Sequence, residues 1–80
     1  MFDYNIYPEN NFEQFKNACT IIERNFPKAE KRELIIDVDG TTIQTYSIED
    51  KNIDVIDDYD IGAVYIKSDL ILDFLRDKKW

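Results

Sequence analysis

The chain contains no histidine and only one cysteine, Cys19, among its 80 residues. Without histidine it lacks the usual general base of enzymes, the Ser/His and Cys/His nucleophile pairs, and the commonest transition-metal ligand. A single cysteine forms no internal disulfide, which fits a reducing compartment, and we expect Cys19 to be a small core residue. These absences favour a protein that is not an enzyme and that uses no cofactor or metal.

Long apolar runs are missing as well. No uncharged apolar segment approaches the roughly 20 residues that a membrane span requires, and the N-terminal sequence MFDYNIYPENN is too polar for a signal peptide. We therefore expect a cytoplasmic protein without membrane contact. Hydrophobic residues at 44% and aromatic residues at 14% suffice for one modest core, so residues 1–80 are predicted to form a single small domain.

The net charge of −7 is concentrated in one part of the chain. Residues 34–60 contain a single base, Lys51, whereas acids and bases balance in the rest of the sequence. A local excess of one sign attracts a partner of opposite sign, although acidic turns also keep small proteins in solution. The acids of this segment are Asp37, Asp39, Glu49, Asp50, Asp54, Asp57, Asp58 and Asp60.

The sequence between Pro8 and Pro27 predicts an amphipathic helix. Asn10 and Glu13 have the spacing of a capping box, and Pro27 opposes any continuation of the helix because it lacks an N–H. Apolar residues recur there at steps of three and four, as on the buried face of a helix: Phe12, Phe15, Cys19, Ile22 and Phe26.

From Glu33 onward the pattern changes to that of strands. β-Branched residues surround Asp39-Gly40, and this dipeptide is a strong signal for a type I′ hairpin turn. Such a turn would set Val38 opposite Thr41, although the loop length leaves the register open. Further strands are expected at residues 53–56 and 61–68.

After these strands, Ser68 and Asp69 predict the start of a final helix, since a serine cap and an acidic first turn both favour a helix N-terminus. The predicted fold is therefore α+β, with a helix, a three- to four-stranded antiparallel sheet and a second helix in two layers. The buried face of the final helix would hold Leu70, Ile71, Phe74 and Leu75.

The segment LIIDVDGTT (34–42) resembles the nucleophile motif of the haloacid-dehalogenase phosphatases. The resemblance implies that Asp37 attacks phosphorus, that Asp39 shuttles a proton, and that both help to hold magnesium. Those enzymes have a long parallel sheet, however, and only forty residues follow Gly40. That is too few for successive crossover units of about thirty residues each, so we interpret the motif as a hairpin.

Other binding chemistries have weaker support. The acidic loops lack the ligand spacing of an EF-hand, which leaves only weak Ca²⁺ or Mg²⁺ binding by Asp57, Asp58 and Asp60 as an alternative. Tyrosines stack on bases in many nucleic-acid-binding proteins, but they do so beside a basic groove. Direct DNA or RNA binding is therefore not expected.

Carboxylates can instead imitate phosphates. Residues four apart on a helix rise about 6 Å, close to the spacing of successive phosphates, and Asp69, Asp73 and Asp77 would form such a row on the predicted final helix. A solvated helix face is the alternative interpretation of that row. The predicted partner-binding residues are Glu49, Asp50, Asp54, Asp57, Asp58, Asp60, Asp69, Asp73 and Asp77.

The predicted layout, the acidity and the apolar strand entering a hairpin at ELIIDVDG (33–40) resemble the small acidic anti-CRISPR proteins of phages. The resemblance implies an inhibitor whose acidic side chains enter the basic groove of a CRISPR effector, where DNA is normally read. Phage inhibitors of uracil-DNA glycosylase and immunity proteins against nuclease toxins share the same features.

We therefore expect a non-enzymatic inhibitor that occupies the groove of a basic nucleic-acid-binding protein, either a nuclease or a CRISPR effector. Two alternatives stay open. One is an immunity protein or antitoxin against a nuclease toxin. The other is an acidic interaction module of a phage or cellular assembly that imitates no nucleic acid.

Overall fold

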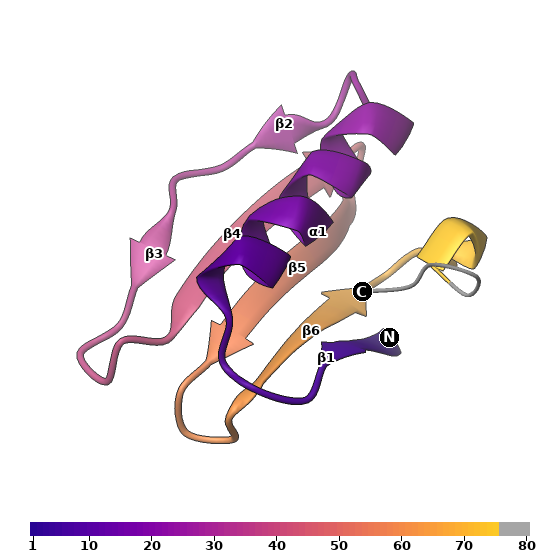
Figure 1. The fold of residues 1–80 in the computed structure, drawn as a ribbon. Coiled ribbons are helices and arrows are strands. Elements are labelled where there is room, and N and C mark those ends of the chain that lie inside the picture. Colours follow the sequence, from indigo (N-terminus) through magenta and orange to yellow (C-terminus); the bar gives the residue numbers. More distant parts are fainter. Residues whose placement is uncertain (76–80) are drawn as a thin grey trace.

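The computed structural model describes residues 1–75. Within them, one α-helix and a six-stranded antiparallel sheet form an α+β fold, and the helix lies across one face of the sheet (Figure 1). The elements are β1 (Phe2–Tyr7), α1 (Phe12–Asn25), β2 (Glu30–Lys31), β3 (Ile35–Ile36), β4 (Thr42–Ile48), β5 (Lys51–Asp58), β6 (Ala63–Ser68) and a 3₁₀ helix at Asp73–Leu75.

The strand order is β1–β6–β5–β4, and the two short strands β2 and β3 share the outer edge of β4. Strands β4, β5 and β6 form a meander of antiparallel neighbours. Alternate turns of a meander lie at the same end of the sheet. The β3–β4 and β5–β6 turns are therefore together at the lower end in Figure 1, and the β4–β5 turn is at the opposite end.

The predicted number of three to four strands was too low. β1 was missed because Asp3 and Asn5, residue types that are depleted in strands, alternate with its apolar residues. β2 precedes Glu33, where the strand pattern was expected to begin, and both of its residues are exposed. It is a strand because it pairs with β4, which a local pattern cannot reveal. β5 is also longer than the expected strand at 53–56.

The N-cap of the helix lies one residue later than predicted. Asn11, rather than Asn10, is the N-cap, and its side chain accepts a hydrogen bond from the Gln14 N–H at 3.0 Å. The amide of Asn10 instead donates to the backbone oxygen of Asp58 at 2.6 Å, which ties the start of α1 to the end of β5. The helix ends before Pro27, as predicted.

The hairpin around Gly40 exists, but its loop is longer than the predicted type I′ turn. Asp37 N–H donates to the Thr41 carbonyl at 2.8 Å, and Gly40 N–H donates to the Asp37 carbonyl at 3.0 Å. Residues 38–40 thus form a three-residue loop, with Gly40 at a φ of +92° as a G1 bulge requires. The resulting register pairs Ile35 with Ile43 and Ile36 with Thr42.

The predicted final helix is wrong for the residues that the structure describes. Ser68 Oγ accepts a hydrogen bond from Leu70 N–H at 2.9 Å, but only the short 3₁₀ helix follows. The Leu72 N–H donates to the hydroxyl of Tyr4 in β1 at 2.8 Å, whereas a helix capped at Ser68 would need that N–H for itself. Leu72 and Leu75 are the residues buried here.

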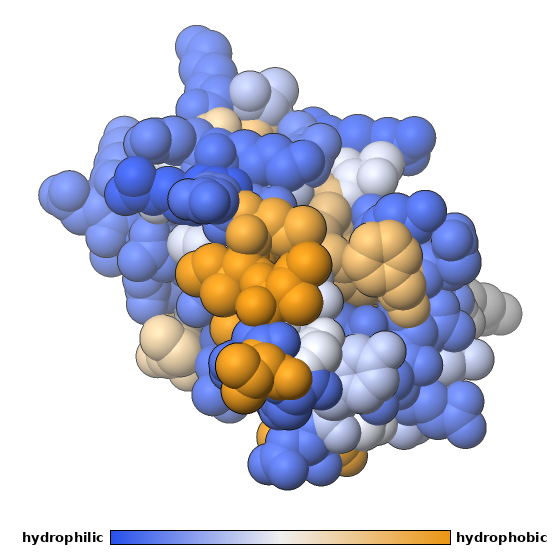
Figure 2. All heavy atoms as spheres, turned by 90° about the vertical axis from the view of Figure 1, so that its left-hand side faces the viewer, coloured by the Kyte–Doolittle hydropathy of each residue, from blue (hydrophilic) through white to orange (hydrophobic). Residues whose placement is uncertain are grey.

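The outer edge of the sheet is interrupted between β2 and β3. Arg32 N–H still bonds to the Thr45 carbonyl at 2.9 Å, but the register then slips by one residue before β3. The buried side chain of Gln44 donates to the Arg32 carbonyl at 2.6 Å and so satisfies it. Figure 2 faces this side of the molecule and shows a group of hydrophobic residues surrounded by hydrophilic ones.

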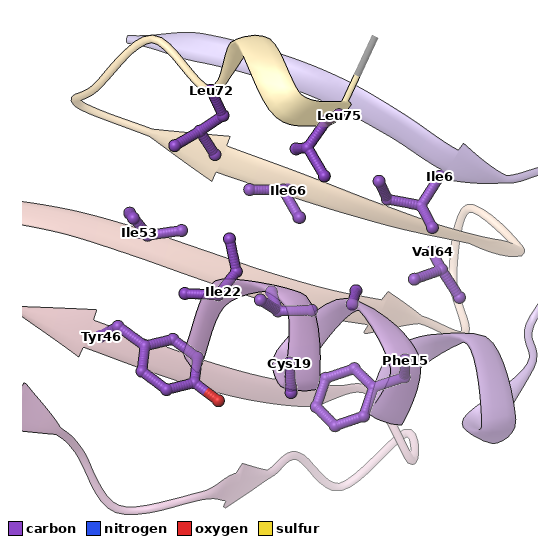
Figure 3. Packing of buried hydrophobic residues seen from close by; sticks show 12 residues of the cluster. Ile6, Phe15, Cys19, Ile22, Tyr46, Ile53, Val64, Ile66, Leu72 and Leu75 are labelled. Carbon is purple, nitrogen blue, oxygen red and sulfur yellow. The ribbon is translucent and has the colours of Figure 1, made fainter. Parts of the chain in front are cut away.

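The core lies between α1 and the sheet (Figure 3). From the predicted helical stripe, Phe15, Cys19 and Ile22 are buried, whereas Phe12 is 53% exposed. Ala18 completes the buried face of α1. The other buried hydrophobic residues of the core are Ile6, Tyr46, Ile53, Val55, Val64, Ile66, Leu72 and Leu75.

Candidate acidic interface

Three of the predicted binding residues gather at the end of the sheet that holds the β4–β5 turn. Glu49 and Asp50 form that turn and are exposed. Asp69 joins them because its N–H donates to the Asn52 carbonyl at 2.9 Å, and its carboxylate accepts a hydrogen bond from Asn52 N–H. We call Glu49, Asp50 and Asp69 the opposite-end acids, because they lie at the end of the sheet opposite the β3–β4 and β5–β6 turns. Lys51 lies beside them in sequence.

The predicted row of phosphate-like carboxylates is not formed by the described residues. Asp69 and Asp73 are exposed, but the chain between them is not helical, so they lack the spacing expected of a helix face. Asp77 lies outside the described residues. Asp54 sits in the middle of β5, where it accepts a hydrogen bond from Thr45 Oγ1 at 2.7 Å and faces Lys67 across the strand pair.

The other predicted residues lie at the end of the sheet where the β3–β4 and β5–β6 turns meet. Tyr59 N–H donates to Thr41 Oγ1 at 3.0 Å, and the Tyr59 ring packs against Gly40. Neither turn, at residues 37–41 or 58–62, contains lysine or arginine. The carboxylates at this end are those of Asp37, Asp39, Asp58 and Asp60, which we call the acidic end.

Backbone hydrogen bonds hold most of these carboxylates in place. Asp37 accepts from the Val38 N–H at 2.8 Å, and Asp39 accepts from the Thr41 N–H at 2.9 Å. The pKa of Asp58 lies below its usual value because its carboxylate accepts hydrogen bonds from the Ile61 N–H and the Tyr65 hydroxyl. Hydrogen bonds therefore hold three of the four carboxylates of the acidic end at fixed positions.

Asp57 has a structural role at the same end. Its side chain is only 3% exposed, and it accepts hydrogen bonds from the Asn11 N–H at 3.3 Å and from the Asn10 amide at 3.2 Å. A buried carboxylate at the first turn of α1 also interacts favourably with the helix dipole. Asp57 thus anchors α1 to β5, and we leave it out of the interface.

Asp37 and Asp39 were missed as binding residues because their motif was interpreted only as a hairpin. The signal that could have placed them was the strand order. In a meander, the turn before β4 and the turn after β5 lie at one end of the sheet. Asp37 and Asp39 therefore lie at the same end of the sheet as Asp58 and Asp60, although about twenty residues separate the two turns in the sequence.

The geometry gives no support to the phosphatase resemblance. Asp37 and Asp39 follow a strand that pairs antiparallel with β4, not the parallel strand that the resemblance implied. One carboxylate oxygen of each is already engaged by the turn. Among residues 1–75, no three His, Cys, Asp or Glu side chains form a group that could hold a metal ion.

Cys19 lies beside a cleft of about 290 Å³ between α1 and the outer edge of the sheet. Nearby, the Tyr46 hydroxyl donates to Glu23, whose carboxylate is 3.1 Å from the Lys31 ammonium. Burial raises the pKa of the Cys19 thiol to about 11, so the thiol is uncharged at neutral pH. Since thiolate is the reactive form, Cys19 is not an activated nucleophile.

We expect the thiol of Cys19 to react slowly in the folded protein. A pKa near 11 in place of 9.0 lowers the thiolate fraction at pH 8 by about 100-fold, and burial slows access further. Labelling with a disulfide reagent at pH 8, with and without denaturing urea, measures the difference. Equal rates in the two conditions would show that Cys19 is accessible and reactive.

Comparisons with protein-family models, curated proteins and solved structures found no match to this chain. Within residues 1–75, no helix has the length and apolar character needed to cross a membrane. The function is therefore inferred from the surface itself, where the acidic end combines four carboxylates from two turns in contact.

Proposed function

We propose that the chain is a non-enzymatic binding protein whose acidic end enters the basic, nucleic-acid-binding groove of another protein. The observation that carries this proposal is the contact between the β3–β4 and β5–β6 turns. It brings four carboxylates together at one end of the sheet without a lysine or arginine in either turn. A local excess of negative charge steers a partner of the opposite sign toward this surface.

The fixed positions of the carboxylates support mimicry of phosphates. Phosphate oxygens are held by the nucleic-acid backbone, and here turn hydrogen bonds hold the carboxylates of Asp37, Asp39 and Asp58. Groups that are already ordered lose less conformational entropy when they bind. Lysine and arginine side chains placed to neutralise phosphates can therefore pair with this surface at low entropic cost.

The partner class follows from this chemistry. A nuclease or a CRISPR effector presents a suitable basic groove, in line with the resemblance to anti-CRISPR proteins, and an immunity protein against a nuclease toxin would use the same surface. The acidic end repels phosphates, so the proposal includes no direct nucleic-acid binding. We also propose a cytoplasmic location, where such partners work, and no membrane contact.

A second function has one observation in its favour. An interaction module of a larger assembly needs no charge mimicry, and it would use exposed apolar surface instead. Such a surface lies along β3, where Ile35 and Ile36 are 55% and 68% exposed. The two functions differ in whether nucleic acid competes with this protein for the partner.

Capture from host lysate tests the proposal. The immobilised protein would be incubated with lysate treated with nuclease, washed at low salt and eluted with increasing salt, and the eluate identified by mass spectrometry. We expect a basic nucleic-acid-binding protein that elutes as salt rises, because exposed charges are screened. Retention of only acidic or salt-insensitive partners would contradict the proposed function.

A further inference from the structure

The cleft between α1 and the outer edge of the sheet contains a free hydrogen-bond acceptor. Gln44 lines this cleft and is only 4% exposed. Its amide nitrogen donates to the Arg32 carbonyl at 2.6 Å and to the Thr45 carbonyl at 3.3 Å. Because both partners are carbonyl oxygens, the nitrogen must lie on that side of the amide, and the oxygen Oε1 lies on the other side.

Oε1 of Gln44 opens to the cleft. It accepts no hydrogen bond from residues 1–75, whereas every fully buried side-chain nitrogen or oxygen of these residues has a partner. Oε1 is therefore not sealed inside the protein, and the cleft is the space that Gln44 lines. A largely buried acceptor is stabilised when a donor reaches it, so a ligand with an N–H or O–H group fits this position.

The walls of the cleft are largely apolar, and two of them are aromatic. Phe12 and Phe15 both line it from α1, with their ring centroids 5.8 Å apart. Phe12 and Leu34 are 53% and 44% exposed, so each keeps surface free for contact. An apolar cavity of roughly 150 Å³ is enough for benzene. At about 290 Å³, this cleft has room for two fused rings, which pack well against phenylalanine.

The charged groups of the cleft are already paired. The Lys16 ammonium lies 3.2 Å from Glu13, and the Lys31 ammonium lies 3.1 Å from Glu23. Glu23 also accepts a hydrogen bond from the Tyr46 hydroxyl. These pairings favour an uncharged ligand. A protein surface laid over the cleft would have to desolvate the ion pairs at its rim, whereas a small molecule inside it leaves them in water.

We propose that this cleft binds a small, uncharged aromatic molecule that carries one hydrogen-bond donor. The ring of the ligand packs against Phe12 and Phe15, and its N–H or O–H donates to Oε1 of Gln44. Cys19 contributes a small apolar contact to the same cleft. This inference does not rest on the proposed function.

Indole and benzofuran test the hydrogen bond without any change to the protein. The two molecules have the same two-ring shape, but benzofuran has an oxygen in place of the N–H donor. Each would be titrated to about 3 mM into isotope-labelled protein, and the backbone amide signals followed by NMR. We expect indole to bind with a dissociation constant of about 1 mM or less and to shift the amide signals of Cys19, Thr20 and Leu34.

Benzofuran should bind at least about tenfold more weakly than indole, because it leaves the Gln44 oxygen without a donor. Equal affinity for the two molecules would overturn the proposal, since the ligand would then not donate to Gln44. An indole titration that leaves the amide signals of the cleft unchanged would also overturn it.

A matched pair of variants locates the ring contact. Phe12→Ala removes one aromatic wall, whereas Phe2→Ala removes a ring of 43% exposure from β1, at the opposite edge of the sheet. We expect indole to bind about tenfold more weakly to Phe12→Ala, on the scale of one aromatic pair, and equally well to Phe2→Ala. Circular dichroism would establish that both variants are folded. Unchanged binding to Phe12→Ala would contradict the assigned site.

Two further ligands test the charge and the size of the molecule. The indoleacetate anion carries a negative charge, and N-acetyltryptophanamide represents a tryptophan side chain on a partner protein. We expect both to bind more weakly than indole. Tighter binding of the anion would overturn the assignment of an uncharged ligand. Tighter binding of the amide would overturn the assignment of a free small molecule, because the cleft would then fit a side chain of a partner.

Discussion

Replacing three carboxylates of the acidic end should abolish most of the binding to the captured partner. The variant is Asp37→Asn/Asp39→Asn/Asp60→Asn, and its matched control is Glu49→Gln/Asp50→Asn/Asp69→Asn in the opposite-end acids. Both remove three negative charges from the net −7. Asparagine keeps an oxygen that can accept the turn hydrogen bonds of Asp37 and Asp39, so the fold should be preserved.

The expected loss is large because steering and contact both depend on these groups. Electrostatic steering raises association rates by roughly 10- to 1,000-fold, and breaking a desolvated charge pair costs about 2–5 kcal/mol. Association rates at low salt, measured by surface plasmon resonance, should fall by about tenfold or more for the acidic-end variant. The opposite-end control should bind nearly as the wild type does.

Equal losses in the two variants would mean that net charge, and not the acidic end, attracts the partner. Thermal melts of both variants provide the stability control. If both bind like the wild type, the acidity serves only to keep the protein in solution.

Gly40→Val should destabilise the fold substantially. Gly40 has a φ of +92°, where a β-branched residue is strained, and a Cβ built there would lie 3.1 Å from the Tyr59 ring. Strain of this kind costs about 1–3 kcal/mol, and displacing Tyr59 adds to it. Urea denaturation of the variant and the wild type measures the difference in the free energy of unfolding.

A second substitution separates strain from crowding. Asparagine tolerates positive φ better than valine does, so Gly40→Asn should lose less stability than Gly40→Val although it also crowds Tyr59. A Gly40→Val protein that unfolds at the same urea concentration as the wild type would contradict the described turn. Because Tyr59 also joins the two turns, Gly40→Val should weaken partner binding along with stability.

Local sequence patterns were sufficient for the helix and for the hairpin around Gly40. The periodicity of α1 directly reports its buried face, and Gly40 is required by the backbone geometry of the loop. Within residues 1–75, the final helix was predicted wrongly because the Tyr4 hydroxyl takes the Leu72 N–H. That contact joins residues 68 positions apart, and no local pattern encodes it.

The acidic character was visible in the sequence, but its division between two ends of the sheet was not. That division follows from the strand order, which determines which turns are neighbours. The role of Asp57 could have been predicted from a strand period of two, since Ile53, Val55 and Asp57 share the face of β5 that packs against α1. The longer strand was needed to recognise that alternation.

Competition for the partner's groove tests the mimic function most directly. A labelled nucleic acid that binds the captured partner would be titrated with this protein at fixed salt, and its release followed by fluorescence anisotropy. We predict complete displacement, with one binding event excluding the other and with weaker displacement by the acidic-end variant. A complex that contains partner, nucleic acid and this protein together would contradict the proposed mimicry.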